Sequence, residues 1–253
     1  MKVMDQRRNE IVEFVNANQT VTFTQLKEKF SSVSDMTLRT DLKYLDQAKK
    51  IVRIHGGAKS LEEVAGNDDV LKLRYGRNIE EKKEIAQKAL AFVEPSKTIF
   101  IDSGSTTTML AHILKDQNNI FYTSGLTCAM EMGKLTKAKI AVTGGTMNTR
   151  SFSVNGMDGI RCLEKVNFDI AFIGVTRYAS NTGFTCESLE DCVLKRKAIE
   201  QAKKVIVLMD SSKVEKKGTY TICHLEQVDT LISDSLLSDS FKKECKKHGL
   251  SVY

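Results

Sequence analysis

Residues 31–47, which read SSVSDMTLRTDLKYLDQ, decide the fold of the N-terminal part of the chain. The hydroxyl-rich start of this stretch predicts a turn, and Ser34 is placed to cap a helix over residues 35–47. One face of that helix carries leucines at i, i+4 and i+7, which predicts its buried side; they are Leu38, Leu42 and Leu45. The flanks and the opposite face carry Arg39, Thr40, Lys43 and Tyr44.

The flanking sequence predicts two more helices and a hairpin. Apolar residues at helical spacing indicate a first helix over residues 6–17, and a short second helix begins after Thr22 or Thr24. Two helices joined by a tight turn are typical of a helix-turn-helix. Downstream, residues 51–54 predict a strand and residues 55–58 (HGGA) a tight turn before the chain continues, so we expect a wing.

The exposed face of the third helix has the chemistry of a DNA-reading surface. Arg39 can donate two hydrogen bonds to guanine, Thr40 can contact a base edge or a thymine methyl group, and Lys43 can neutralise a phosphate. The alternative is a solvated polar face on a purely structural helical bundle. The wing, with Arg53 and His55 on it, favours DNA binding.

The charge distribution supports a basic N-terminal part. Residues 1–60 hold 11 Lys and Arg against 7 Asp and Glu, whereas the rest of the chain holds 27 against 25. A net charge of +6 over 253 residues is too small for a protein that coats nucleic acid non-specifically.

The N-terminal part resembles the DeoR family of bacterial regulators. The residues that carry the resemblance are Arg7 or Arg8 at the start of the first helix, SDMTLRTDL over residues 34–42, Leu45, and RIHGGA over residues 53–58. Thr40 stands where the family has a second basic residue, and Ala48 where a glycine commonly precedes the wing strand. The resemblance implies a winged helix-turn-helix with a DNA-binding set of Ser34, Thr37, Arg39, Thr40, Lys43, Arg53 and His55.

The remainder of the chain predicts an α/β domain with a mainly parallel sheet. After an acidic linker, a helix is expected over residues 77–93, and buried strands then alternate with helical patterns. The expected strands are 98–101, 120–122, 139–142, 169–173, 205–209 and 230–232. We expect the domains to span residues 1–60 and 76–253, with residues 61–75 between them.

Three loops that follow predicted strands indicate a site for a polyanion. They are DSGSTTT at residues 102–108, TGGT at residues 143–146 and DSSK at residues 210–213. Ligands of such sheets bind at the carboxyl ends of the strands, and hydroxyls with backbone N–H groups at a helix start suit a phosphate. Each loop also has an ordinary structural explanation, as a helix cap, a turn or a piece of surface.

The DeoR resemblance extends over this part, whose family fold is similar to ribose-5-phosphate isomerase and CoA transferases. The matching motifs are residues 102–107, 143–145, 172–174 and 210–213, together with Glu187 followed by Lys195. The resemblance implies that a phosphorylated sugar contacts Asp102, Ser103, Gly104, Ser105, Thr106, Thr107, Gly144, Gly145, Glu187, Lys195 and Lys213. Glu190 is an equally placed alternative to Glu187.

These features predict a transcription regulator, a repressor of a sugar operon whose DNA affinity changes when a phosphorylated sugar binds. The alternative is an isomerase-like enzyme with an accessory helical domain, which would need a base about 3 Å from the substrate proton. Reading two half-sites requires an even homo-oligomer, a dimer or a tetramer. The six cysteines form no C-x-x-C pair, so we expect no metal and no cofactor. Without an apolar leader or membrane span, a cytoplasmic protein is expected.

Overall fold

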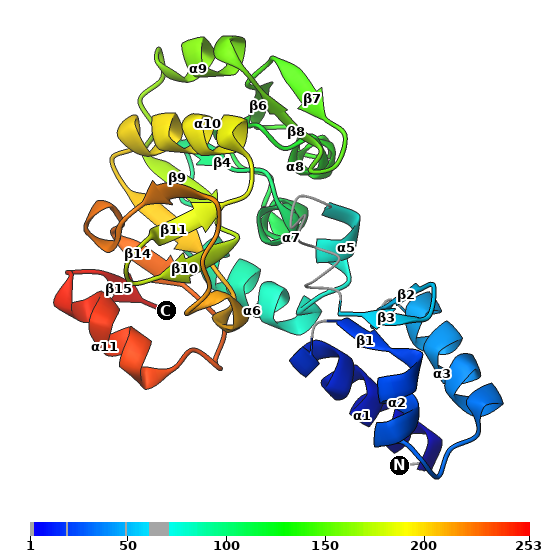
Figure 1. Cartoon of the computed structure of the whole chain (residues 1–253). Helices are drawn as coiled ribbons and strands as arrows, with labels where there is room; N and C mark the ends of the chain where they lie inside the picture. The colour runs from blue at the N-terminus through cyan, green and yellow to red at the C-terminus, as the bar shows by residue number, and fades with distance from the viewer. Residues whose placement is uncertain (1–2, 19, 49, 61–70) are drawn as a thin grey trace. The chain divides into compact units, whose positions relative to one another are not determined.

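The computed structural model describes residues 3–18, 20–48, 50–60 and 71–253, which fall into two compact units, Met1–Gly76 and Arg77–Tyr253 (Figure 1). Most of the expected linker, residues 61–70, lies outside the described residues. Residues 71–75 form the short helix α5 (Leu71–Tyr75).

The N-terminal unit is built from three helices and a small antiparallel sheet. Its elements are α1 (Val3–Asn18), β1 (Thr20–Thr22), α2 (Phe23–Lys29), α3 (Asp35–Gln47), β2 (Val52–Ile54) and β3 (Gly57–Lys59). The strands lie in the order β1-β3-β2, so β2 and β3 form the wing and β1 adds a strand that the sequence did not predict. β1 has only three residues, too few for an alternating pattern.

Side-chain caps fix where α2 and α3 begin. The Thr22 hydroxyl accepts from the Gln25 N–H while the Gln25 side chain accepts from the Thr22 N–H, which is a capping box. The Ser34 hydroxyl accepts from the Thr37 N–H at 3.2 Å and starts α3 where the sequence predicted it. The leucine face of α3 packs into a core that also contains Ile11, Val15, Leu26 and Ile51.

The C-terminal unit contains helices, a large sheet and two smaller sheets. In chain order its elements are α6 (Ile79–Leu90), β4 (Thr98–Ile101), α7 (Ser105–Ile113), β5 (Ile120–Thr123), α8 (Leu126–Met132), β6 (Lys139–Val142), β7 (Thr146–Asn148), β8 (Ser153–Asn155), α9 (Met157–Leu163), β9 (Ile170–Gly174), β10 (Arg177–Ala179), β11 (Gly183–Cys186), α10 (Leu189–Glu200), β12 (Val205–Leu208), η1 (Ser211–Lys213), β13 (Tyr220–Cys223), η2 (Leu225–Gln227), β14 (Thr230–Ile232), α11 (Asp239–Lys247) and β15 (Ser251–Val252).

The large sheet has seven strands in the order β15-β14-β12-β9-β4-β5-β6, and all pairs are parallel. This confirms the predicted α/β fold with a mainly parallel sheet. Alternate residues of each strand enter opposite cores. On β9, Ile170 and Phe172 pack with helices α6, α7 and α8, whereas Ala171 and Ile173 face the other layer.

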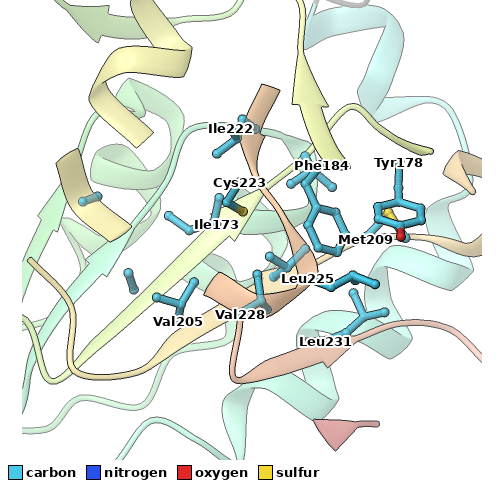
Figure 2. Packing of buried hydrophobic residues seen from close by; sticks show 14 of the residues in the cluster. Ile173, Tyr178, Phe184, Val205, Met209, Ile222, Cys223, Leu225, Val228 and Leu231 are labelled. Atoms are coloured by element: carbon cyan, nitrogen blue, oxygen red, sulfur yellow. The ribbon is translucent and has the colours of Figure 1, made fainter. Parts of the chain in front are cut away.

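The second layer contains helices α10 and α11 and the antiparallel sheet β10-β11-β13. Figure 2 shows Ile173, Val205 and Leu231 of the large sheet facing Cys223 and Leu225. The sequence did not predict the strands of the small sheet. Each has three or four residues, and β13 pairs with β11 across a long intervening segment.

Because its strands are parallel, the large sheet gathers the loops that follow β4, β5, β6, β9 and β12 at one edge. This edge carries the polyanion loops singled out from the sequence. No helix in the described part of the chain is both long and apolar enough to cross a membrane.

Candidate functional site

The exposed face of α3 carries the side chains that the sequence selected for DNA. Arg39, Thr40 and Lys43 are exposed, and Thr37 is half-buried next to the cap. Two residues that the sequence did not single out as DNA contacts belong to the same surface, Met36 and Tyr44, at 76% and 50% exposure. On the opposite side Leu38, Leu42 and Leu45 are buried. The face therefore has the polar and apolar groups that a major groove can accept.

Arg39 is held in one orientation by an aromatic ring. Its guanidinium carbon lies 4.3 Å from the centre of the Phe23 ring, which belongs to the start of α2. Such a stack leaves the in-plane N–H groups of the guanidinium available for a partner. Arg39 was predicted from the sequence as a DNA contact, but the stacking of Phe23 on it was not.

Asp41 fastens α3 to α1. Its carboxylate oxygens accept from Arg7 Nε at 2.7 Å and from Arg8 Nε at 2.8 Å. Arg8 also lies over the ring of Tyr44, with its guanidinium carbon 3.7 Å from the ring centre. Asp41 is buried, so this charge has to be paired in the fold. The arginines that the family resemblance placed at the start of the first helix therefore contact the recognition helix.

The wing is tied to the end of α3. Asp46 Oδ1 accepts from the Arg53 N–H at 2.9 Å, and the Arg53 and His55 side chains are exposed. Gly57 is required where β3 pairs with β1, because a Cβ there would lie 2.1 Å from the Val21 carbonyl oxygen. The α3 helix ends at Gln47, and the C-cap residue that follows, Ala48, has a φ of −76° that needs no glycine.

In the C-terminal unit, the loop after β4 leads directly into α7 and collects hydroxyl groups. Ser103, Ser105 and Thr106 are buried as residues, and their hydroxyls make no hydrogen bond to protein among the described residues. The Thr107 and Thr108 hydroxyls instead donate to the Gly104 carbonyl, at 3.0 and 2.7 Å. The first N–H groups of α7 have no partner within the helix. Hydroxyls and N–H groups together make this loop a candidate anion site.

Beside that loop lies a buried ion pair between Asp102 and Lys195. Lys195 Nζ donates to Asp102 Oδ2 and, at 2.9 Å, to the Gly174 carbonyl, while the Gly174 N–H donates to Asp102 Oδ2 at 2.9 Å. Burial disfavours the Lys195 ammonium, but attraction to Asp102 and Asp191 outweighs it and raises the pKa of Lys195. The lysine therefore neutralises a carboxylate that would otherwise repel an anion.

The remaining oxygen of Asp102 is the exceptional atom of the site. Asp102 Oδ1 is buried and has no hydrogen-bond partner among the described residues. A buried acceptor without a partner is costly unless something supplies a donor. A hydroxyl group of a ligand is a suitable donor.

Two further loops at this edge have polar networks of their own. Gly145 has a φ of +114°, and a Cβ there would lie 2.2 Å from the Asn155 carbonyl oxygen. The Asn155 side chain in turn donates to Asp191 Oδ1 at 2.5 Å. Gly144 has a φ of +85° with open space around it. The glycine pair is thus required by backbone geometry.

The third loop connects to the start of the unit. Lys213 Nζ donates to the Val175 carbonyl at 2.7 Å and lies 3.4 Å from Asp210 Oδ2. Asp210 Oδ1 accepts from Asn78 Nδ2 at 2.9 Å, and Asn78 immediately precedes α6, the first helix of the unit, without a side-chain capping hydrogen bond. Burial raises the pKa of Asp210. The Lys213 cation and the hydrogen bonds to Asp210 together lower it by more, so the pKa of Asp210 lies below its ordinary value.

Glu187 and Glu190 differ in placement. Glu187 Oε2 accepts from the Thr219 hydroxyl at 2.5 Å, and its Oε1 is buried without a partner among the described residues. Glu190 is exposed on the first turn of α10 and accepts from the Ser188 hydroxyl at 2.9 Å. Neither makes a hydrogen bond to the Asp102–Lys195 pair in the described part of the chain.

The sequence missed Asp41, Asn155, Asn78 and Asp191 as parts of these sites. Asp191 alone had a local signal, because it precedes Lys195 by four residues on one helix and therefore shares its face. Among the described residues, no group of three or more His, Cys, Asp or Glu side chains is placed to hold a metal ion.

A capped recognition helix and a two-stranded wing define a winged helix-turn-helix protein. Residues 7–64 match the model of the DeoR-like helix-turn-helix domain, and residues 77–235 match that of the DeoR C-terminal sensor domain. The chain therefore belongs to the DeoR family of transcriptional regulators, as the resemblance predicted. Its curated relatives are named as transcriptional regulators or repressors and not as enzymes, which does not favour the isomerase alternative.

Three relatives illustrate the similarity over the whole length. The chain is 31% identical to the HTH-type transcriptional regulator GolR of Listeria innocua, covering 98% of this chain and 97% of that protein. It is 28% identical to IolR of Bacillus subtilis, covering 100% and 99%. It is 30% identical to the lactose phosphotransferase system repressor of Streptococcus mutans, covering 96% of each.

Among solved structures, the chain is similar to ribose 5-phosphate isomerase A from Methanocaldococcus jannaschii, with a TM-score of 0.42 and 18% identity. That match covers 55% of this chain and 56% of that one.

Proposed function

We propose that the protein is a sequence-specific DNA-binding repressor of a carbohydrate operon, and that a phosphorylated sugar bound in the C-terminal unit changes its affinity for operator DNA. The DNA contacts are Ser34, Thr37, Arg39, Thr40 and Lys43 of the helix with Arg53 and His55 of the wing. The name of one relative, a repressor of a lactose phosphotransferase system, supports the carbohydrate assignment.

The observation that carries the effector assignment is the hydroxyl loop at the start of α7. The hydroxyls of Ser103, Ser105 and Thr106, which have no hydrogen-bond partner among the described residues, lie with the helix N–H groups beside a carboxylate that Lys195 neutralises. A phosphate accepts hydrogen bonds from such groups. The unpartnered Asp102 Oδ1 accepts from a sugar hydroxyl, which a bare phosphate lacks.

Thr107, Gly104 and the glycine pair complete the candidate site, and Lys213 adds a cation at its edge. Glu187 is the better candidate for a further ligand contact, because its Oε1 is buried without a partner in the described part of the chain, whereas Glu190 is exposed.

Ligand and DNA influence each other by linkage. A sugar phosphate that binds the DNA-incompetent arrangement more tightly must weaken DNA binding by the same differential free energy. Two DNA-binding units on successive half-sites, roughly 34 Å apart, require an even homo-oligomer.

Thermal unfolding with a panel of sugar phosphates tests the effector site. A ligand present at about a thousand times its Kd should stabilise the protein by about 4 kcal/mol. Ser105→Asp introduces a negative charge at the first residue of α7 and should abolish the shift. Ser240→Asp is the matched control, since Ser240 lies exposed in the first turn of α11, which has the same length of nine residues.

Two outcomes and one further variant decide the result. Stabilisation by a phosphorylated sugar but not by the free sugar, lost in Ser105→Asp and kept in Ser240→Asp, supports the proposal. Equal stabilisation of all three proteins places the phosphate elsewhere. Ser105→Ala removes one hydroxyl without adding charge, so it should weaken the shift even if the aspartate variant is unstable.

A further inference from the structure

The first turn of the recognition helix α3 exposes an apolar side chain. Met36 is 76% exposed, and among the described large hydrophobic residues only Met130 is more exposed. Met36 lies about 160° around the helix from the buried Leu38, at the ordinary 100° per residue, so it points away from the core. An unburied methionine at this position has no structural role in the unit.

The hydroxyl groups around Met36 are already engaged inside the protein. Thr40 Oγ1 donates to the Met36 carbonyl at 2.9 Å, so its hydrogen is used and its methyl group stays on the surface. The hydroxyls of Ser34 and Thr37 are hydrogen-bonded to each other at 2.8 Å, and Ser34 also accepts from the Thr37 N–H. These groups offer few donors to a base edge.

One flank of this face is cationic. At 100° per residue, Lys43 and Arg39 lie about 20° and about 60° around the helix from Met36 on the same side, and the Arg39 guanidinium is stacked on Phe23. An apolar strip bordered by cations on one side suits a major groove, where the thymine methyl group is the apolar feature of the floor and phosphates line the edges.

We infer that Met36, with the methyl group of Thr40, reads the C5-methyl group of thymine in the operator, and is thereby a specificity-determining residue. The inference rests on the proposed DNA-binding function. The flexible thioether side chain can follow the methyl group without strain. Recognition on this part of the helix is then apolar. The sequence suggested a thymine methyl contact for Thr40 as one of two possibilities, but it did not single out Met36.

Replacement of thymidine by 2′-deoxyuridine tests the inference, because it deletes only the methyl group. The probe is a duplex that the full-length protein selects from a random pool, and each thymidine is replaced in turn. At one or two positions in each half-site, wild-type affinity should fall about three- to tenfold, the effect of withdrawing one buried methyl group and its contacts. Met36→Ala should bind the thymidine and deoxyuridine duplexes equally well at those positions.

Met130→Ala is the matched control, since it removes an equally exposed methionine from α8 in the other unit. It should keep the wild-type response to deoxyuridine. Met36→Gln gives a second test, because an amide in the same place should shift the selected base toward adenine. Both Met36 variants change an exposed side chain on a helix, so folding is not affected.

Several results would overturn the inference. The same deoxyuridine penalty in wild type and Met36→Ala would mean that another residue reads the methyl group. A change of oligomeric state in Met36→Ala with an unaltered penalty would make Met36 a protein contact. If the wild type selects a site but no deoxyuridine substitution weakens it, the inference fails while the proposed function stands. If the wild type selects no site at all, the proposed function fails as well.

Discussion

Neutralising Asp41 should destabilise the DNA-binding unit far more than neutralising any exposed carboxylate on the same helix. The Asp41 side chain is 2% exposed and pairs with Arg7 and Arg8, which are 23% and 11% exposed. Asp41→Asn keeps the shape but removes the charge that both guanidinium groups need. Breaking a buried ion pair costs about 3 to 5 kcal/mol, and the partial exposure of the arginines places this case near about 3 kcal/mol.

That cost is comparable to the whole stability of so small a unit, since a core of about 60 residues rarely supplies more than about 3 to 5 kcal/mol. Hydrogen exchange of the full-length protein, followed by mass spectrometry, measures the effect locally. Peptides from α3 should lose about a hundredfold of their protection, because each 1.4 kcal/mol corresponds to about tenfold. Peptides from the large parallel sheet should be unchanged.

Asp35→Asn is the control. Asp35 is on the same helix and pairs with Lys27 at 3.0 Å, but their side chains are 62% and 38% exposed. An exposed pair of this kind contributes no more than about 1 kcal/mol. If Asp41→Asn and Asp35→Asn lower the protection of α3 equally, the ion pairs of Asp41 with Arg7 and Arg8 do not hold the recognition helix in place.

Three other predictions concern the C-terminal unit. Gly145→Ala should destabilise it by about 3 kcal/mol or more, because the new Cβ would clash with backbone. Gly144→Ala, which has open space around it, should cost about 1 to 2 kcal/mol. Equal thermal unfolding midpoints for the two variants would contradict this prediction. Among the six cysteines only Cys162 is not buried, so Ellman's reagent should label one thiol rapidly in the native protein and six in denaturant. Asn78→Gly keeps the left-handed backbone at φ 48° but removes the amide bound to Asp210. The variant should bind the ligand alone and DNA alone as the wild type does, but the ligand should change its Kd for DNA less. If the ligand changes that Kd as much as in the wild type, the Asn78–Asp210 contact does not link the two binding events.

The sequence predicted best what local interactions determine. The α3 helix begins after Ser34 and ends at Gln47 as expected, because the capping hydroxyl and the leucine spacing act within a few residues. The carboxyl-edge loops were found for a similar reason, since each follows a buried apolar strand. The parallel sheet then brings loops that are distant in the chain to one edge.

Side-chain contacts between residues far apart in the chain could not be predicted from the sequence. Asp41 lies 34 residues from Arg7, and the Asp102–Lys195 contact spans 93 residues. Neither spacing follows from helix or strand periodicity, because each depends on how whole elements pack. That Asp102 Oδ1 has no partner among the described residues is likewise a result of packing, since the two neighbouring donors, Lys195 Nζ and the Gly174 N–H, both donate to Oδ2.

Whether the effector site controls DNA binding is decided by the affinity of the full-length protein for its selected DNA duplex, measured by fluorescence anisotropy with and without the sugar phosphate that stabilises the protein. Saturating ligand should change the Kd by about 5- to 150-fold in the wild type and leave that of Ser105→Asp unchanged. An identical Kd with and without a ligand that binds the wild type would contradict the claim that this site controls DNA binding.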